Sequence, residues 1–384
     1  MVPPEILVKP EHEELRGWAR EFAAREIAPV AVGMDRDDAY PRKLVRKMGE
    51  HGLLGINIPV EYGGLGLDLL SSVLVGEEIA KVSLSAALLI GVQNGLVGYP
   101  LSQFGTKDQK ERFLPRLAKG EMIGCYGLTE PGAGSDAANI QTRAEKEGDS
   151  YRINGSKIWI SQGFYADMVV LFARTGTTED RAAGMSAFIV EKGTPGFEVG
   201  AKLEVMGARG TGTAELFFKD CIVPSREMLG SAGDGFLIAM AVLNQGRVGA
   251  AAGAVGVAEA ALEACISYSK GRMLFGRSLS NLEAIRFLIA EMATRIEAAR
   301  LLTYRAACVR DRGEEFIKEA SMAKLFATET AVWASERAIQ VHGGIGLSKQ
   351  LPLERYYRDS KVLDIVEGTS EVQKWILSRE LIGD

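Results

Sequence analysis

The sequence has few of the residues that build metal centres and disulfide frameworks. It contains four cysteines and three histidines in 384 residues, and no two cysteines have the C-x-x-C spacing. This scarcity argues against a structural zinc site, and we expect no metal centre. The cysteines are expected to be small buried residues of a protein in a reducing compartment.

Long apolar runs and dense basic runs are also missing. No segment approaches ~18 uninterrupted apolar residues, so we expect no membrane span. A net charge of −5 and a pI near 5.6 argue against a nucleic-acid partner. The start, MVPPE, lacks the apolar core of a signal peptide, and acidic residues follow too soon for a mitochondrial transit peptide. We expect a soluble cytoplasmic protein, prokaryotic or processed.

The pattern of apolar and turn residues changes twice along the chain. Residues 11–122 place apolar side chains at helical spacing, residues 123–232 show short β-rich runs between turns, and long alanine-rich stretches follow. We therefore predict an α+β multidomain protein with a helical domain at 1–122, a β domain at 123–232 and a helical bundle at 233–384. The predicted helices are 11–27, 41–52, 71–82, 85–98, 106–119, 236–244, 248–268, 281–312 and 315–342; the predicted strands are 151–153, 168–173, 186–190 and 214–218.

A single carboxylate near the end of the chain is a candidate general base. Glu367 lies in the run DIVEGTSE, between an apolar stretch and a glycine followed by hydroxyl residues. Apolar neighbours raise the pKa of a carboxylate by desolvating its ionised form, and Gly368 leaves room for a ligand. The alternative interpretation is a helix start, with Thr369 or Ser370 as N-cap of a helix over 372–381.

A glycine-rich loop is the second candidate. Residues 125–136 (CYGLTEPGAGSD) contain three glycines and can present several backbone N–H groups to one anion. The loop lacks the lysine of a Walker loop and does not match a Rossmann turn, so backbone and Ser135 would have to hold a phosphate. The alternative is a plain connection between helical and β regions.

Five runs, in order, resemble the acyl-CoA dehydrogenase family over nearly the whole chain. They are GLTEPGAGSD at 127–136, NGSKIWIS at 154–161, RMLFG at 272–276, QVHGGIG at 340–346 and VEGTSE at 366–371. The resemblance implies an N-terminal helical domain, a middle β-barrel and a C-terminal four-helix bundle. It also implies an FAD-dependent enzyme that removes the α-proton and the β-hydride of an acyl-CoA thioester and passes electrons to an electron-transfer flavoprotein.

Roles for individual residues follow from the same resemblance. Glu367 matches the base. Some members carry the base instead before a recurrent arginine, where this chain has Gly246, which cannot act; an isovaleryl-type enzyme is therefore disfavoured. Residues implied to contact FAD are Tyr126, Leu128, Thr129, Gly134, Ser135, Trp159, Ser161, Thr369 and Glu371. Those implied to reach the FAD of a neighbouring subunit, in a dimer of dimers, are Arg272, Phe275, Gln340, Gly343 and Gly344. Those implied on the acyl-CoA side are Ser135, Asn244, Arg247, Val366 and Gly368. For Arg247 an ordinary buried ion pair is the alternative.

The chain departs from the family pattern at several positions. Two usual glutamines are Glu283 and Arg286, whose spacing would allow a helical ion pair. Val366 replaces a frequent tyrosine, which favours a roomier pocket for short or medium acyl chains, branched or alicyclic ones included; the alternative is a neutral exchange. Ala87 stands where glutaryl-specific relatives carry an arginine, so a dicarboxylic substrate is disfavoured because its buried carboxylate would lack a partner.

Two further hypotheses remain. An acyl-CoA oxidase or flavin monooxygenase-like relative would share the fold but let oxygen reach the flavin. Glu367 favours the dehydrogenase over the monooxygenase, which needs no α-proton base. A non-catalytic helical scaffold would give a colourless protein.

Overall fold

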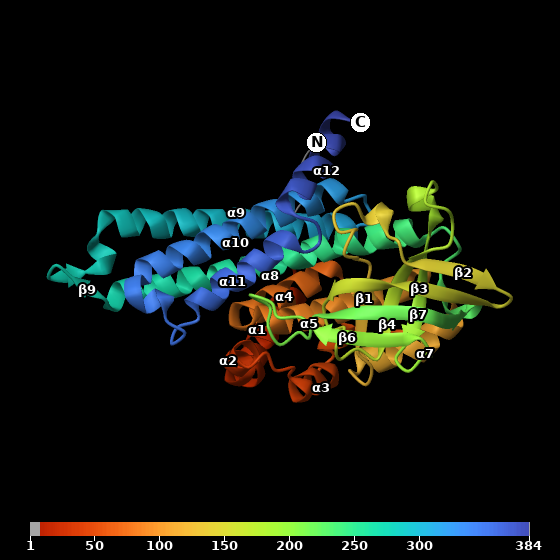
Figure 1. Ribbon diagram of the computed structural model, residues 1–384. Coiled ribbons are helices and arrows are strands. Elements are labelled where there is room, and N and C mark those ends of the chain that lie inside the picture. Colours follow the sequence, from red (N-terminus) through yellow and green to blue (C-terminus); the bar gives the residue numbers. More distant parts are fainter. Residues whose placement is uncertain (1–7, 384) are drawn as a thin grey trace.

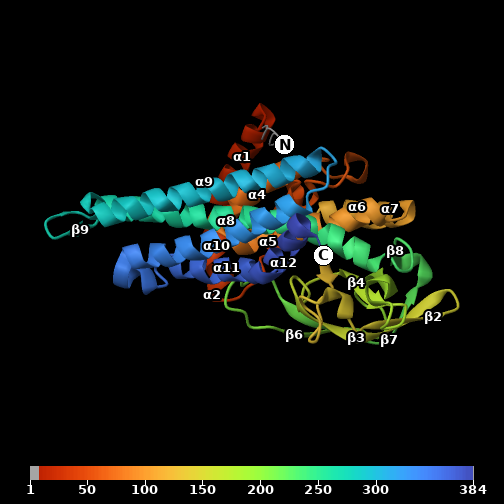
Figure 2. The ribbon, with the colours of Figure 1, turned by 90° about the horizontal axis from the view of Figure 1, so that it is seen from above.

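The computed structural model describes residues 8–383 and divides into helical and β parts, as predicted from the pattern of apolar and turn residues. A long helical bundle ends against a β-sheet, and the N-terminal helices pack beside both (Figures 1 and 2). The N-terminal part contains α1 (Pro10–Phe22), the π-helix η1 (Ala23–Ile27), α2 (Ala28–Arg36), α3 (Arg42–Glu50), the 3-10 turns η2 (Leu53–Gly55) and η3 (Val60–Tyr62), α4 (Leu69–Val82), α5 (Leu84–Gly91), the π-helix η4 (Val92–Gly98), α6 (Tyr99–Phe104) and α7 (Lys107–Ala118).

The middle part is an eight-stranded sheet. Its strands are β1 (Gly124–Gly127), β2 (Arg143–Glu147), β3 (Ser150–Ile160), β4 (Met168–Arg174), β5 (Met185–Glu191), β6 (Phe197–Lys202), β7 (Ala214–Pro224) and β8 (Met228–Leu229). The order is β6-β7-β3-β2-β4-β5-β8, and β1 pairs with β4 in parallel. The sheet has its own apolar core, in which β4 is buried at every residue. β1 carries the glycine-rich loop at its end, and β3 leads to Trp159.

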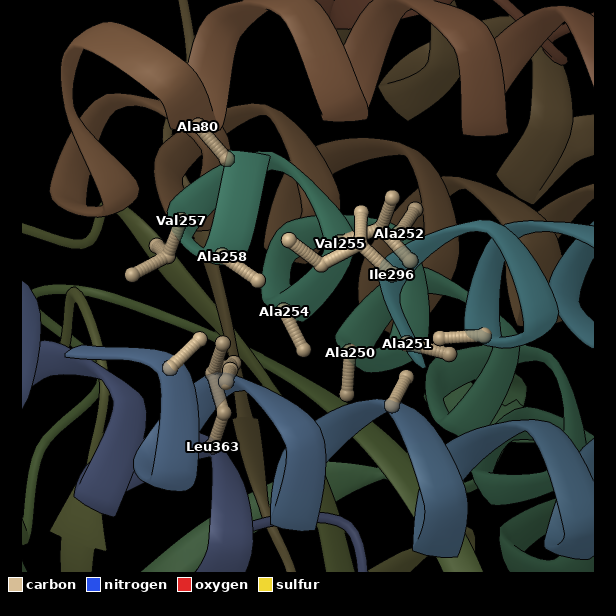
Figure 3. Close-up of a cluster of buried hydrophobic side chains, with 14 of the residues drawn as sticks. Ala80, Ala250, Ala251, Ala252, Ala254, Val255, Val257, Ala258, Ile296 and Leu363 are labelled. Atoms are coloured by element: carbon tan, nitrogen blue, oxygen red, sulfur yellow. The ribbon is translucent and has the colours of Figure 1, made fainter. Parts of the chain in front are cut away.

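The C-terminal part is a bundle of long helices. It contains α8 (Gly235–Gly271), the hairpin strands β9 (Met273–Leu274) and β10 (Arg277–Ser278), the turn η8 (Leu279–Asn281), α9 (Glu283–Asp311), α10 (Ile317–His342), the turn η9 (Gly343–Leu347), α11 (Leu353–Ile365) and α12 (Ser370–Ile382). Alanines and valines of α8 fill the space between their neighbours, with Ala80 from α4, Ile296 from α9 and Leu363 from α11 (Figure 3). Such small side chains allow the helices to approach closely, which fixes the positions of the polar groups that these helices carry.

Two details of the sequence prediction are wrong. The helices predicted at 236–244 and 248–268 form one continuous helix of 37 residues, α8, with Gly246 inside it. Packing on several sides outweighs the helix-weakening effect of glycine. The ion pair considered for Glu283 and Arg286 does not form within the described residues, and both side chains are exposed.

Two helical stretches are long and apolar enough to cross a membrane, by length and composition alone. They are Leu84–Phe104 and Gly235–Gly271, and their apolar windows are 67% and 72% buried inside the protein. Both are core helices of this fold, because their apolar surfaces already pack against other helices and the sheet.

Candidate active site

Glu367 occupies a tight turn between the last two helices. α11 ends at Ile365, Glu367 has a φ of 58° and Gly368 a φ of 93°, and α12 begins at Ser370. Positive φ is ordinary for glycine but strained for glutamate. Thr369 is the N-cap of α12, since its hydroxyl accepts a hydrogen bond from the backbone N–H of Val372. Both interpretations of the segment are therefore compatible, because the helix start and the carboxylate occupy adjacent positions.

The carboxylate of Glu367 lies directly over Gly246 of α8. A Cβ atom added at Gly246 would lie 2.5 Å from Oε2 of Glu367 and 2.8 Å from its Cδ. No side chain fits at Gly246 while Glu367 keeps this position. The glycine that weakens α8 locally thus leaves the space that the Glu367 carboxylate occupies.

Burial controls the charge of Glu367. Oε2 is buried and has no hydrogen-bond partner, and the backbone N–H of Glu367 has no acceptor among the described residues. Desolvation raises the pKa of Glu367 to about 7, and the positive charges of Arg247 and Lys324 oppose this rise. The carboxylate can therefore exchange a proton near neutral pH.

Unpartnered polar atoms gather around this carboxylate. Ten buried side-chain polar atoms between residues 8 and 383 lack a hydrogen-bond partner, and three of them belong to Glu367 or to residues that interact electrostatically with it. The three are Tyr126 Oη, Arg247 Nε and Glu367 Oε2. Buried polar groups are normally paired, so this concentration indicates a place where a bound molecule supplies the missing partners.

Tyr126 and Arg247 face the carboxylate from β1 and α8. Burial, and then the charge of Glu367, raise the pKa of Tyr126 well above its usual value. Burial lowers the pKa of Arg247, which Glu367 partly restores. The Arg247 guanidinium donates to Asn244 Oδ1, one turn earlier on α8. Arg247 forms no direct ion pair among the described residues, so the ordinary ion pair considered for it is absent there; it interacts with Glu367 through longer-range electrostatics.

A buried ion pair holds the glycine-rich loop. Lys157 Nζ lies 2.6 Å from Glu130 Oε1 and donates to the carbonyl of Leu128 at 3.1 Å. Glu130 also accepts from the backbone N–H groups of residues 141 and 142. Thr129 is fixed separately, because its carbonyl accepts from the N–H of Ile158 at 3.0 Å. Contacts with β3 therefore fix residues 128–130 of the loop, whereas residues 131, 132 and 134–136 are exposed to solvent.

Other predicted residues near the loop remain exposed. Trp159, at the end of β3, has a φ of 62° and is 57% exposed, although it is a large apolar ring. Gly134 and Ser135 are exposed in the loop, and Ser161 is half-buried just after β3. An exposed tryptophan beside an open glycine-rich loop offers a flat apolar surface for a ring system.

The remaining predicted residues lie elsewhere. Phe275 is 87% exposed in the hairpin β9–β10, with the exposed Arg272 beside it. This hairpin is at the end of the bundle opposite the sheet (Figures 1 and 2). Gln340, Gly343 and Gly344 are also exposed, at the end of α10. Around the carboxylate, Asn244, Val366, Gly368 and Thr369 are half-buried, and Glu371 is exposed on α12.

Sequence reasoning missed two side chains of this site. Gln373 donates to the carbonyls of Glu367 and Gly368, and Lys324 donates to the carbonyl of Asp364. The available signal was a lysine inside the alanine-rich run of α10. No comparable signal marks Gln373, which stands among other polar residues of α12.

Fold and site together define an acyl-CoA dehydrogenase, and the comparisons agree. Family models described as the N-terminal, middle and C-terminal domains of acyl-CoA dehydrogenase match residues 9–121, 125–221 and 233–382. The chain belongs to this family of FAD-dependent oxidoreductases.

Individual relatives match from end to end. An acyl-CoA dehydrogenase of Bacillus subtilis is 47% identical, with 98% of this chain and 99% of the relative covered. The solved structure of butyryl-CoA dehydrogenase from Megasphaera elsdenii has a TM-score of 0.96 at 40% identity, covering 98% and 100%. A chain from a structure described as the electron transferring flavoprotein of Acidaminococcus fermentans has a TM-score of 0.96 at 44% identity, covering 99% and 100%.

The space that Gly246 leaves for the carboxylate gives a first prediction. Gly246→Ala is expected to displace the Glu367 carboxylate and to lower kcat about 100-fold, because misplacing a reacting group by about 1 Å has that effect. Stability should change little, since the clashing atoms are the mobile end of a side chain. Steady-state turnover and thermal melting measure the two effects.

The matched control is Gly249→Ala, one turn further along α8. An added Cβ there meets nothing within 4 Å, so this variant should keep its turnover and gain slightly in stability. Equal turnover in the two variants would contradict the placement of Glu367 over Gly246.

Proposed function

We propose that this enzyme oxidises short-chain acyl-CoA thioesters to trans-2-enoyl-CoA in the cytoplasm, with Glu367 as the base that removes the α-proton. The observation that carries the proposal is the buried carboxylate of Glu367, unpartnered, with its pKa raised to about 7 and seated on a glycine. Such a group is poised to accept a proton when a substrate carbon replaces the missing partner.

The surroundings of Glu367 suit proton removal beside a thioester. Arg247 and Lys324 favour the ionised carboxylate, which is the form that accepts a proton. As the α-proton leaves, negative charge develops on the thioester oxygen and needs hydrogen-bond donors. The unpartnered backbone N–H of Glu367 is such a donor, and the adjoining residue, Gly368, has no side chain that could cover it.

The residues on the sheet side fit FAD. The exposed Trp159 ring, the open loop and the unpartnered Tyr126 hydroxyl supply a flat surface, backbone groups and a buried donor for a flavin. When bound, FAD accepts the β-hydrogen of the substrate as hydride. Residues proposed to hold it are Tyr126, Leu128, Thr129, Gly134, Ser135, Trp159, Ser161, Thr369 and Glu371. The substrate side is assigned to Ser135, Asn244, Arg247, Val366 and Gly368.

The reaction removes one proton and one hydride. The proton goes from Cα of the thioester to Glu367, the hydride leaves Cβ, and a C=C bond forms between the two carbons. Glu367 must then release its proton, which a pKa near 7 permits at neutral pH.

Two features bear on the alternative, an oxidase or a monooxygenase-like relative. A buried base over Gly246 serves α-proton removal, which monooxygenation does not require. The similarity to a chain from a structure of an electron transferring flavoprotein supports a protein electron acceptor of that kind. We therefore include an electron-transfer flavoprotein as the partner in the proposal.

The exposed hairpin supports assembly into an oligomer. Phe275 is 87% exposed with a φ of 51°, and Arg272 beside it is exposed and can donate to phosphate oxygens. We propose that Arg272, Phe275, Gln340, Gly343 and Gly344 reach the FAD of another copy, in a dimer of dimers. Light scattering of the FAD-loaded protein tests this, and a monomer would contradict it.

Substrate choice gives the direct test of the proposed function. We expect kcat/KM to be highest for short, neutral acyl-CoAs such as butyryl-CoA and isobutyryl-CoA, and far lower for glutaryl-CoA. No arginine lies between Lys81 and Phe104 to pair with a distal carboxylate, and burying it unpaired is costly by several kcal/mol.

A panel that also includes cyclohexanecarboxyl- and octanoyl-CoA should be run with an artificial acceptor, with and without oxygen. Turnover that needs the acceptor supports the dehydrogenase, whereas turnover on oxygen alone identifies an oxidase. Preference for glutaryl-CoA would reveal an unrecognised basic group in the pocket. Preference for octanoyl-CoA would show that Val366 does not set the chain length.

A further inference from the structure

Glu367 needs support, because its backbone conformation is unfavourable for glutamate. A φ of 58° places it in the left-handed region, and such residues persist only where the surrounding structure fixes them. The turn between α11 and α12 is four residues long, and its ends are joined by a hydrogen bond from Ser370 Oγ to Asp364 Oδ1 at 2.6 Å, which does not touch Glu367 or Gly368. The contacts that hold this turn therefore decide where the carboxylate lies.

Gln373 holds the turn from α12. Its Nε2 donates to the carbonyl of Glu367 at 3.1 Å and to the carbonyl of Gly368 at 2.8 Å. The side chain is fully buried, and a Cβ atom added at Gly368 would lie 2.7 Å from Nε2. The side-chain amide of Gln373 therefore holds both residues of positive φ, Glu367 and Gly368, and packs closely against Gly368.

Lys324 holds the turn from the other side. Its Nζ donates to the carbonyl of Asp364 at 2.9 Å, in the last turn of α11. The side chain is fully buried, and desolvation lowers its pKa to about 8, against the charges of Asp364 and Glu367. Burying a lysine ammonium costs free energy, which the hydrogen bond to Asp364 and the negative charges of Asp364 and Glu367 offset in part.

We propose that Gln373 and Lys324 are positioning residues that clamp the Glu367 turn and keep its carboxylate over Gly246. The proposal rests on the proposed function of Glu367 as the base. Gln373 touches the backbone of the turn and Lys324 touches the helix that leads into it, so neither needs to contact the substrate. Their effect on the reaction passes through the position of Glu367.

Loss of the clamp should also change the environment of the carboxylate. The titratable groups that interact with Glu367 or adjoin it are Tyr126 from β1, Arg247 from α8, Lys324 from α10, Asp364 from α11 and Glu371 from α12. Gln373 carries no charge, so replacing it leaves these charges in place. A shift in the titration of Glu367 would then report movement of its carboxylate toward water.

The test is Gln373→Met, which keeps the length of the side chain and removes both hydrogen bonds. We expect kcat with butyryl-CoA to fall about 100-fold while KM and FAD affinity change little. The acidic inflection in the pH profile of kcat/KM, which reports the free enzyme, should move to lower pH, as solvation returns the carboxyl toward its usual pKa. Solvent exchange of the α-hydrogen of butyryl-CoA in D2O should slow by a similar factor.

Gln109→Met is the matched control. Gln109, in α7, is also fully buried, and its Nε2 donates to two carbonyls, those of Arg226 and Met228, at the start of β8. This variant should lose stability without a change in the pH profile or in α-hydrogen exchange. Equal effects of the two substitutions on kcat, at matched stability, would overturn the clamp.

Lys324→Met provides the second variant if Gln373→Met does not fold. It removes a positive charge as well as a bond, so the pH inflection should move upward rather than downward. Because that shift follows from the charge alone, the clamp is tested by α-hydrogen exchange at a pH where Glu367 is fully ionised, which should slow about 100-fold. Exchange at the wild-type rate there would overturn the role of Lys324 as a positioning residue. If the wild-type enzyme neither oxidises acyl-CoA nor exchanges its α-hydrogen, the proposed function fails; if it does both and the variants match their controls, only the clamp fails.

Discussion

Glu367→Gln should lose nearly all turnover while FAD and acyl-CoA still bind. The amide keeps the shape of the side chain but cannot accept the α-proton. General-base catalysis contributes roughly 10²–10⁴-fold to rate, and that factor is the minimum expected loss of kcat. Steady-state turnover with butyryl-CoA measures the loss, and equilibrium titration with FAD and with acyl-CoA measures binding.

The same substitution should make the folded protein more stable at high pH. The folded pKa of Glu367, about 7, lies above its usual 4.5, so burial stabilises the protonated form. The associated stability is fully present below pH 4.5 and is lost as pH rises through 7. At about 1.4 kcal/mol per pKa unit, ionisation of Glu367 destabilises the wild type by up to about 3 kcal/mol above pH 7.

Glutamine does not ionise, so the variant does not lose folding stability as the pH rises through 7. Urea unfolding at pH 5.5 and 8.5 should show a larger gain for the variant at the higher pH. Wild-type turnover in Glu367→Gln would show that another group is the base. A variant less stable than wild type at pH 8.5 would show that the carboxylate is solvated in solution.

Lys157→Met should have the largest effect on stability. It leaves Glu130 buried as a carboxylate with backbone donors only, and breaking one side of a buried ion pair costs about 3–5 kcal/mol. The loop that Lys157 fixes through the carbonyl of Leu128 should loosen as well. We expect a lower unfolding midpoint and faster loss of FAD, measured by denaturation and by flavin fluorescence.

The double variant Glu130→Gln/Lys157→Met separates charge from packing. It removes the unpaired carboxylate, so a substantial part of the lost stability should return. If the double variant is as unstable as Lys157→Met, packing rather than the buried charge explains the loss. If both variants retain FAD as the wild type does, the ion pair does not control the loop.

The sequence predicted the arrangement of helical and β parts because periodicity changes at their borders. It failed inside α8, where Gly246 looks like an interruption between two helices. Isolated propensity disfavours glycine, but α8 is packed on several sides and the missing side chain makes room for Glu367. Contacts between residues far apart in sequence are not visible in local periodicity.

The candidate site was only partly predictable, for a similar reason. Glu367 could be singled out by its apolar flank and the glycine after it, and Tyr126 and Arg247 by the family pattern. The positive φ of Glu367 could not be foreseen, since glutamate has no preference for it. Gln373 and Lys324 were missed because their importance comes from backbone carbonyls across the turn, not from their own neighbours in sequence.

Because α8 is one uninterrupted helix, it also fixes the angle about the helix axis between residues near the sheet domain and residues near the hairpin. At about 1.5 Å per residue, its 37 residues form a rod about 55 Å long, from the sheet domain to the exposed hairpin. Gly246 and Arg247 lie about a third of the way along it from the sheet domain, and Arg272 directly follows the other end. Inserting or deleting one residue between them would turn one end by about 100° relative to the other. The roles proposed for Glu367 over Gly246 and for Arg272 therefore require a fixed number of residues between these two positions.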